Sequence, residues 1–191
     1  MQTYIALLRG INVGGSNHIK MDKLKESLIS LGLLSVSTYI QSGNILFQFI
    51  QIQKNDLLYL ITEKIKDDFG ITVPVHVLTA AELNKIISAN PFTALNDIAV
   101  DKLHVTFLSQ TPGKEHLSAI HPMKDGGDEA AAIGNVIYLH CPNGYGRTKF
   151  SNTYFEKKLK VNATTRNWKT IKVLQDLAKA KVNDYLGANK T

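Results

Sequence analysis

Three arginines differ from the other basic residues of the chain in type and in setting. Among twenty-two basic residues, arginine occurs at Arg9, Arg147 and Arg166, each close to Gly, Asn, Thr or Ser and with no acidic residue within two positions. A guanidinium group presents a planar fork of donors that suits a carboxylate or a phosphate, whereas the ammonium group of lysine acts as a point charge. This placement predicts that the arginines recognise an anion.

The first candidate site is the glycine-rich segment 10–20. Its length exceeds the roughly two to six residues that usually join a strand to a helix. Glycines let backbone amides turn towards a ligand, and the start of the next helix adds positive potential. The segment fits neither the dinucleotide-binding nor the Walker pattern, so packing within the fold remains an alternative. The candidate ligand-binding residues here are Arg9, Asn12, Gly14, Gly15 and Lys20.

The second candidate site is the segment Tyr39–Asn44, which reads YIQSGN. The carboxamides of Gln41 and Asn44 can bind amides, carbonyls or base edges, and Tyr39 adds a hydroxyl. The same Ser, Gly and Asn residues are also typical of a tight turn between two strands. We favour the turn, and keep Tyr39, Gln41 and Asn44 as candidate ligand-binding residues.

Two basic motifs in the second half complete the candidate set. Arg147, Thr148 and Lys149 lie in a glycine-containing loop before a predicted helix, where helix-end amides and two cations suit an anion. A phosphate-binding loop would need glycine where Cys141 stands, so that motif fails. In ATTRNWKT, we expect a threonine at 164 or 165 to cap the last helix. Arg166 and Asn167 would then lie in its first turn, where a cation opposes the helix dipole and needs a negative partner.

The remaining reactive residue types show no catalytic or metal-binding spacing. The six histidines lack the spacing of metal ligands. His140 and Cys141 are adjacent in a predicted strand and would face opposite sides, so they cannot pair as base and nucleophile. We therefore expect no metal and no cofactor, and the residues leave open whether the protein is an enzyme.

Composition and charge are those of a water-soluble domain with a basic second half. The net charge is +6; residues 1–100 carry eight basic and eight acidic residues, and residues 101–191 carry fourteen and eight. A basic stretch attracts nucleic acid or an acidic partner, although a lysine-covered helix face explains it equally well. One cysteine, no signal peptide and no long apolar run predict a cytoplasmic protein without membrane segments.

Hydrophobic periodicity predicts the elements that position these motifs. Strands are expected at 2–8, 36–40, 45–49 and 73–78, with helices at 21–31 and 55–69, followed by a capping box at 79–82 that opens a third helix to about residue 90. Because residues 4–8 are apolar on both sides of the strand, we expect both faces of this sheet to be covered, unlike an open RNA-binding platform.

The second half repeats this order less completely. Strands are expected at 102–108, 128–133 and 136–141, with a short helix after Pro112, a helix from Ser151 to Leu159 and a final helix over 167–182. The fold class is therefore α+β, with two ferredoxin-like (split βαβ) modules packed together. The expected domains are a first module at 1–90, a connector at 91–101 and a second module at 102–191.

The motifs LLRGINVGGSNHIKM, TYIQSGNILF, GRTKFSN and ATTRNWKT resemble a bacterial family catalogued as domain of unknown function 1697. The resemblance extends over 4–177. It implies a cytoplasmic bacterial protein with paired ferredoxin-like modules. It implies no activity and assigns no catalytic residue.

Three hypotheses about function follow. The leading one is a binding protein whose motifs converge in a cleft between the modules on a phosphate-bearing ligand, either a nucleotide or nucleic acid. The second is an enzyme acting on a small phosphorylated or carboxylated metabolite, with arginines holding the anion and Tyr39, His18 or Lys20 moving a proton. The third is structural: the arginines satisfy carbonyls and acids of the same chain.

Overall fold

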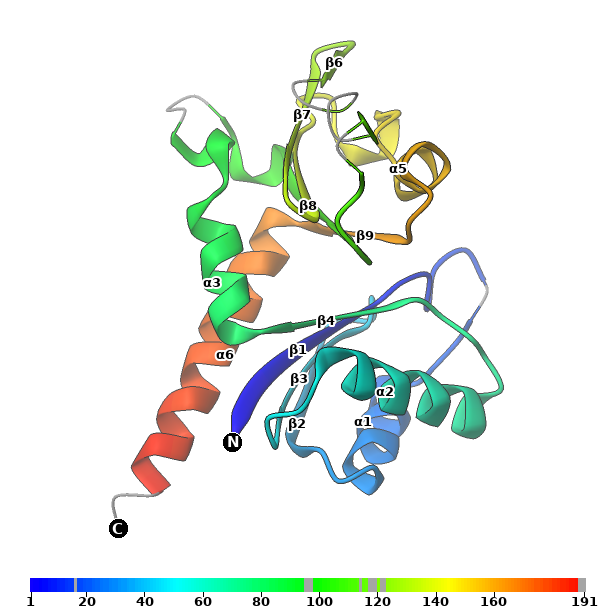
Figure 1. Cartoon of the computed structure of the whole chain (residues 1–191), viewed down its shortest axis with the longest axis vertical. Helices are drawn as coiled ribbons and strands as arrows, with labels where there is room; N and C mark the ends of the chain where they lie inside the picture. Colours follow the sequence, from blue (N-terminus) through cyan, green and yellow to red (C-terminus); the bar gives the residue numbers. More distant parts are fainter. Residues whose placement is uncertain (16, 95–97, 114, 117–119, 121–122, 189–191) are drawn as a thin grey trace. The chain divides into compact units, whose positions relative to one another are not determined.

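The computed structural model describes residues 1–15, 17–94, 98–113, 115–116, 120 and 123–188, and its contacts divide the chain into two units (Figure 1). The first unit comprises Met1–Asn84 together with Leu174–Thr191, and the second comprises Lys85–Val173. This division differs from the predicted ranges 1–90 and 102–191, because the end of the chain joins the first unit. Helices α3 (Ala80–Ser88) and α6 (Trp168–Ala188) each contain a boundary between the units.

The first unit contains a four-stranded antiparallel sheet in the order β2-β3-β1-β4. The central strand β1 is buried along nearly all of its length, which requires apolar residues on both sides of the pleat. The strands are β1 (Gln2–Leu8), β2 (Leu34–Tyr39), β3 (Asn44–Phe49) and β4 (Val75–Thr79).

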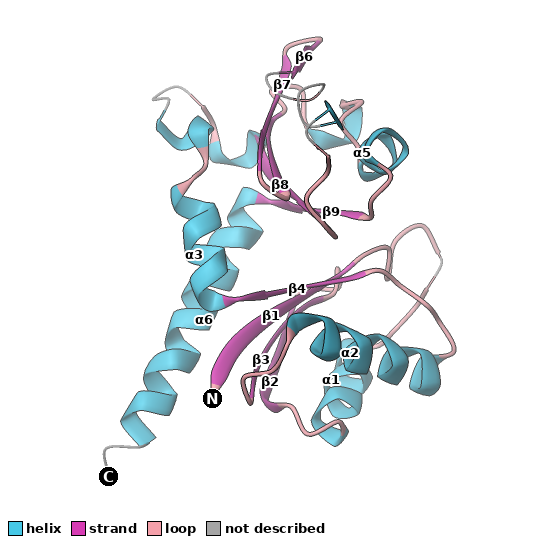
Figure 2. Cartoon of the chain, viewed as in Figure 1, coloured by secondary structure: helices cyan, strands magenta, loops and turns pink. Residues whose placement is uncertain are grey.

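Two helices, α1 (Met21–Ser30) and α2 (Lys54–Phe69), pack into the core of this unit, as Figure 2 shows. Leu57, Ile61 and Ile65 of α2 follow a helical spacing and are fully buried. They share one cluster with Tyr4 and Leu8 of β1, so the periodicity that predicts the helix also defines its buried face. Gly70 ends α2 in the left-handed conformation.

The side of β1 that carries Ile5 and Leu7 is also buried. In the same unit, Gln48 Nε2 of β3 donates to the carbonyl of Lys181 in α6 at 3.0 Å, and Lys181 Nζ donates to the carbonyl of Ser35 in β2 at 2.5 Å. The expectation that both faces of β1 are covered is confirmed. A sheet of this kind offers no open face on which RNA bases could stack.

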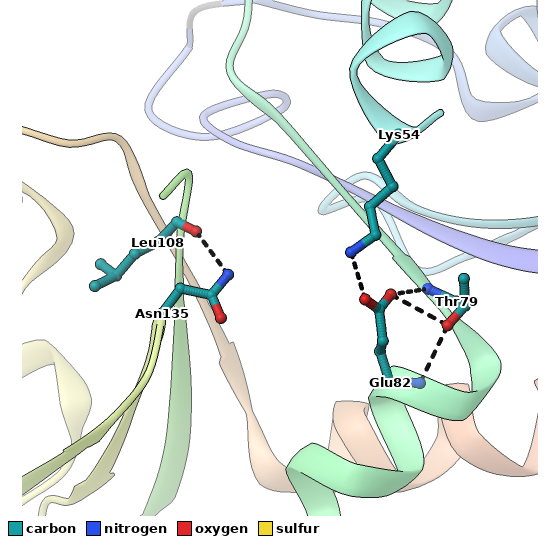
Figure 3. Close-up of polar contacts among 5 residues, drawn as sticks. All are labelled: Lys54, Thr79, Glu82, Leu108 and Asn135. Carbon is teal, nitrogen blue, oxygen red and sulfur yellow. Dashed lines mark hydrogen bonds and ion pairs between the residues drawn. The ribbon is translucent and has the colours of Figure 1, made fainter. Parts of the chain in front are cut away.

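The predicted capping box opens α3 (Figure 3). Thr79 Oγ1 accepts from Glu82 N at 3.1 Å, and Glu82 Oε2 accepts from Thr79 N at 2.8 Å. The second carboxylate oxygen of Glu82 pairs with Lys54 Nζ at 2.5 Å. These reciprocal bonds satisfy amide donors that the first helical turn leaves unpaired.

The second unit contains a five-stranded antiparallel sheet in the order β6-β7-β8-β5-β9. If β6 is left out and the strands of each sheet are numbered by their order in the chain, both sheets have the spatial order 2-3-1-4. Asn135, in the turn between two strands, donates through Nδ2 to the carbonyl of Leu108 at 3.4 Å (Figure 3). The strands are β5 (Leu103–Leu108), β6 (Met123–Asp125), β7 (Asp128–Ile133), β8 (Val136–His140) and β9 (Ala163–Asn167).

One helix, α5 (Asn152–Leu159), packs its buried Phe155 and Leu159 into the core of the second unit. Ser151 caps it as predicted, because its hydroxyl accepts from Tyr154 N at 3.2 Å. Short 3-10 turns occur at Pro91–Ala94, Val100–Lys102 and Tyr145–Arg147. The short helix predicted after Pro112 falls partly outside the described residues.

The prediction that Thr164 or Thr165 caps the last helix is wrong. Both residues lie in β9, and α6 begins at Trp168. Arg166 and Asn167 are therefore the last residues of a strand and do not lie in the first helical turn. Asn167 caps α6, because its Oδ1 accepts from Lys169 N at 2.8 Å. Arg166 therefore does not lie in a helical turn, where its charge would oppose the helix dipole.

Replacing Gly43 by alanine should destabilise the first unit by about 2–4 kcal/mol. Gly43 has φ +72°, and an added Cβ would lie 2.7 Å from Leu8 Cβ and 2.8 Å from Ile11 Cδ1. Gly14→Ala is the matched control, since Gly14 has φ +62° and no atom within 4 Å of such a Cβ. The control should cost only the left-handed penalty of about 1 kcal/mol. Urea unfolding measures both, and equal losses would contradict the steric explanation.

Candidate functional site

The side chain of Asn12 organises the first candidate site. Its Nδ2 donates to the carbonyls of Ile19 and Gln41, both at 2.9 Å, and its Oδ1 accepts from Ile19 N at 2.9 Å. One carboxamide thus closes the segment 10–20 on itself and ties it to the turn after β2. The two polar motifs, joined by a bond between residues 29 positions apart in the sequence, meet here within the first unit.

The backbone of this segment adopts the left-handed conformation repeatedly. Gly10, Gly14 and Gly15 have positive φ, and so do the asparagines Asn12 and Asn17. Asparagine tolerates this region better than other residues that carry a Cβ. Asn17 Nδ2 donates to the carbonyl of Gly10 at 3.1 Å, and Asn12 N donates to that of Asn17 at 3.2 Å. The segment is therefore a braced loop.

The turn at 39–44 has the local bonding that a tight connection needs. Asn44 is fully buried, and its Nδ2 donates to the carbonyl of Tyr39 and to Ser42 Oγ, both at 3.0 Å. Gly43 accepts from Leu8 N at 2.8 Å, which ties the turn to the end of β1. The turn interpretation is supported, and the carboxamide of Asn44 is used inside the protein.

Arg9 and the exposed described residues of 10–20 and 39–43 form what we call the Asn12-braced surface. Lys20, His18 and Gln41 are exposed and Arg9 is half-buried. The sequence contains no acidic residue over 1–21 or over 27–55, so little negative charge in these segments opposes the cations. Val13 is 61% exposed and Ile40 is 52% exposed. Exposed apolar side chains beside cations are typical of a surface that contacts another molecule.

In the second unit, the short 3-10 turn after β8 ends at Arg147, and Thr148 and Lys149 come next. Arg147 and Lys149 are exposed, and Lys149 Nζ pairs with Asp125 Oδ1 at 2.7 Å. This hydrogen bond and the carboxylate charge raise the pKa of Lys149. Thr148 Oγ1 accepts from Phe150 N at 3.1 Å. Of these three residues, Arg147 makes the fewest of the contacts that the structure describes.

Arg166 and Asn167 are neighbours in β9 and therefore face opposite sides of the sheet. Arg166 pairs with Val105 of β5, is 9% exposed and donates through Nη1 to the carbonyl of Thr165 at 3.0 Å. Burial lowers its pKa to about 10, so the guanidinium stays charged at neutral pH. The side chains of Arg166 and Asn167 therefore do not form one site on the sheet.

The side chain of Asn167 forms a hydrogen bond with that of His104. Its Nδ2 lies 3.2 Å from His104 Nε2 and 3.2 Å from the carbonyl of Asp101. Because Asn167 Oδ1 already accepts from Lys169 N, Nδ2 is the donor and His104 Nε2 is the acceptor. The ring of His104 stacks on that of Tyr145, with centroids 4.8 Å apart. Burial lowers the pKa of His104, so the neutral form is favoured. No sequence motif indicates a role for this histidine.

Cys141 is buried, and its surroundings do not favour the thiolate that a nucleophile requires. Burial raises the pKa of its thiol to about 11, the negative charge of Asp128 acts in the same direction, and a hydrogen bond to Thr148 opposes both. A thiol with that pKa is protonated at neutral pH. Among the described residues, no group of three His, Cys, Asp or Glu side chains could hold a metal ion.

The model of a family described as "protein of unknown function (DUF1697)" matches residues 1–138. The chain belongs to this family. The match covers the Asn12-braced surface and ends before the motifs around Arg147 and Arg166. No curated protein matches the chain.

A solved structure of a conserved bacterial protein from Streptococcus pneumoniae is similar over 93% of this chain and 98% of its own. The sequences are 24% identical, and the TM-score is 0.70. This likeness shows the α+β fold with its antiparallel sheets. In the described part of the chain, we find no helix with the length and apolar character needed to cross a membrane.

Replacing Asn12 by aspartate should loosen the Asn12-braced surface and cost about 2 kcal/mol. Aspartate keeps the acceptor and tolerates positive φ, but it removes the two bonds to the carbonyls of Ile19 and Gln41. Amide hydrogen exchange at 11–19 and 41–44 should accelerate. Asn17→Asp is the control, because it removes one exposed bond to Gly10 and should cost less than about 1 kcal/mol. Unchanged exchange in the Asn12 variant would contradict the bracing role.

Stability should fall as the pH drops from about 7.5 to about 5. Burial, together with repulsion from Lys54, lowers the pKa of His76 to about 4 from its ordinary 6.5, although Glu82 acts in the opposite direction. Between these values the unfolded chain takes up a proton that the folded chain does not. The stability that neutral His76 contributes is thus present above pH 6.5 and is lost as the pH falls towards 4.

The expected loss from His76 at pH 5 is about 2 kcal/mol, and His104 adds to it in the same direction. Urea unfolding at the two pH values measures the difference. His76→Gln, which cannot titrate, should flatten the dependence by that amount. An equally steep dependence in the variant would show that this histidine is not the group responsible.

Proposed function

We propose that the protein binds a phosphate-bearing ligand at the Asn12-braced surface, with nucleic acid as the first candidate. The observation that carries the proposal is the carboxamide of Asn12, which holds 10–20 beside Gln41 in one braced arrangement. A braced loop loses little conformational entropy when it binds a ligand. The exposed cations around it would contact phosphate oxygens, and exposed Gln41 would contact a base edge.

Nucleic acid is preferred over a small metabolite because the basic residues are widespread. Within 145–182 the chain carries ten basic and two acidic residues, and Arg147, Lys149, Lys157 and Lys160 of the second unit are exposed. We propose that Arg147 provides a further phosphate contact. Such contacts attract a polyanion without reading its sequence. We propose a bacterial cytoplasm as the setting: the family resemblance implies it, and the single cysteine is compatible with a reducing compartment.

Arg166 is better explained by a structural role. It is nine-tenths buried, and its guanidinium donates to a carbonyl of its own strand. We therefore separate it from the ligand-binding set and group it with contacts that hold β9. For the fold, we propose that each unit is a ferredoxin-like module. The support is the β2-β3-β1-β4 order of the first sheet, which β7, β8, β5 and β9 repeat in the second.

Binding of labelled single-stranded and duplex RNA and DNA, followed by fluorescence anisotropy at several salt concentrations, tests the function. Affinity should fall steeply with salt, because bound phosphates release counterions. Arg9→Gln and Lys20→Gln should each weaken binding about 3- to 10-fold and lower the salt slope by about 1. Lys25→Gln is the matched control, since Lys25 is an exposed lysine of α1. Absence of binding at low salt, or binding without a salt slope, would refute nucleic acid as the ligand.

A further inference from the structure

Helices α3 and α6 lie near the start of β1 (Figure 1). Residues of both helices line a groove, which also contacts Gln2 and Thr3 at the end of β1 that is remote from the Asn12-braced surface. It consists of two adjoining hollows of about 300 and 390 Å³, which share Ala80, Asn84 and Val182. The first also contacts α6 at Gln175, Ala178, Lys179 and Asn183, and the second reaches Met1–Thr3, Gln48 and Ala81. We call this the α3–α6 groove.

Among the described residues, the lining of the groove is rich in carboxamides and contains no acid. Of these lining side chains, five are Asn or Gln, three are alanine, and Lys179 carries a charge. A carboxamide presents a donor and an acceptor in one plane. Small alanines between such groups leave room for a flat ring. The combination suits a planar, uncharged heterocycle with an anionic substituent beside the lysine.

Two of the carboxamides are buried and are held in place by hydrogen bonds. Gln175 is 9% exposed, and its Nε2 donates to Asn84 Oδ1 at 2.8 Å. Gln48 is 8% exposed, and its Nε2 donates to the carbonyl of Lys181 at 3.0 Å. Each bond joins parts of the chain far apart in the sequence. The polar groups are therefore oriented on helices and a strand, where geometry is better defined than on loops.

We propose that the α3–α6 groove binds an adenine mononucleotide. Asn and Gln carboxamides complement the donor and acceptor on the N6 and N7 edge of adenine, and Lys179 would pair with the phosphate. The volumes fall in the range of about 300–1,000 Å³ that is usual for small-molecule sites. None of the described lining side chains is acidic, so none of them repels the phosphate.

This site is separate from the surface proposed for nucleic acid. The groove contacts the start of β1 at Gln2 and Thr3, whereas Arg9 follows its end. Seven residues of extended strand span about 23 Å. A nucleotide bound in the groove therefore shares no residue with the Asn12-braced surface, and the two proposals can fail independently.

Titration with AMP, adenosine and UMP, followed by calorimetry and by backbone amide chemical shifts, tests the proposal. AMP should bind saturably and shift resonances over 80–84 and 175–183, about 10-fold more tightly than UMP. Ala81→Trp should weaken AMP binding at least 10-fold, because Ala81 is exposed and lines the groove, so the new ring fills it without a folding cost. Ala89→Trp, equally bulky at an exposed position outside the lining, should bind AMP normally.

The phosphate contact has its own pair of variants. Lys179→Gln should weaken AMP about 5-fold and leave adenosine unchanged, whereas Lys169→Gln, on the same helix outside the groove, should change neither. Lys20→Gln should leave AMP binding intact. The proposal is overturned if AMP shifts no groove resonance, if Ala81→Trp binds AMP as well as the unmodified chain, or if Lys20→Gln abolishes AMP binding. Equal affinity for adenosine and AMP would also overturn it, since a mononucleotide site requires a phosphate contribution.

Discussion

The first unit depends on one polar side chain in an unfavourable backbone conformation. Asn12 has φ 55°, where most residues with a Cβ are strained, yet its carboxamide makes three bonds of 2.9 Å to Ile19 and Gln41. These bonds fix the segment that connects β1 to α1, and they hold the turn after β2 against that segment. A single side chain thus offsets local backbone strain with bonds that join the segment after β1 to the turn after β2.

The parts of the fold that hydrophobic spacing controls were predictable from the sequence. The strand 2–8 has the predicted bounds, and Leu57, Ile61 and Ile65 face the core as their spacing indicates. The capping box at Thr79 and Glu82 was also predictable, because both of its bonds connect residues three positions apart. Local rules succeed where the partners of a residue are its neighbours in the sequence.

Prediction was poorer where a residue type serves two purposes. Thr164 and Thr165 suit a helix cap, but β-branched residues also suit a strand, and pairing with β5 decides in favour of β9. Asn12 was predicted as a ligand-binding residue, and the bonds of its carboxamide to Ile19 and Gln41 were not foreseen from the sequence. The α3–α6 groove was not predicted at all, because Gln48, Asn84 and Gln175 come from three distant segments and only the folded chain brings them together.

The part of α6 from Leu174 onwards belongs to the first unit, and this bears on how the protein is made. The hydrogen bonds between Gln48 and Lys181 and between Gln175 and Asn84 can form only when α6 is present. Until then the first unit lacks these contacts. A nascent chain leaving the ribosome can therefore form β1 to β4 early, but it cannot finish that unit until α6 has been synthesised. Residues made about a hundred positions after β4 complete the unit to which β1 to β4 belong.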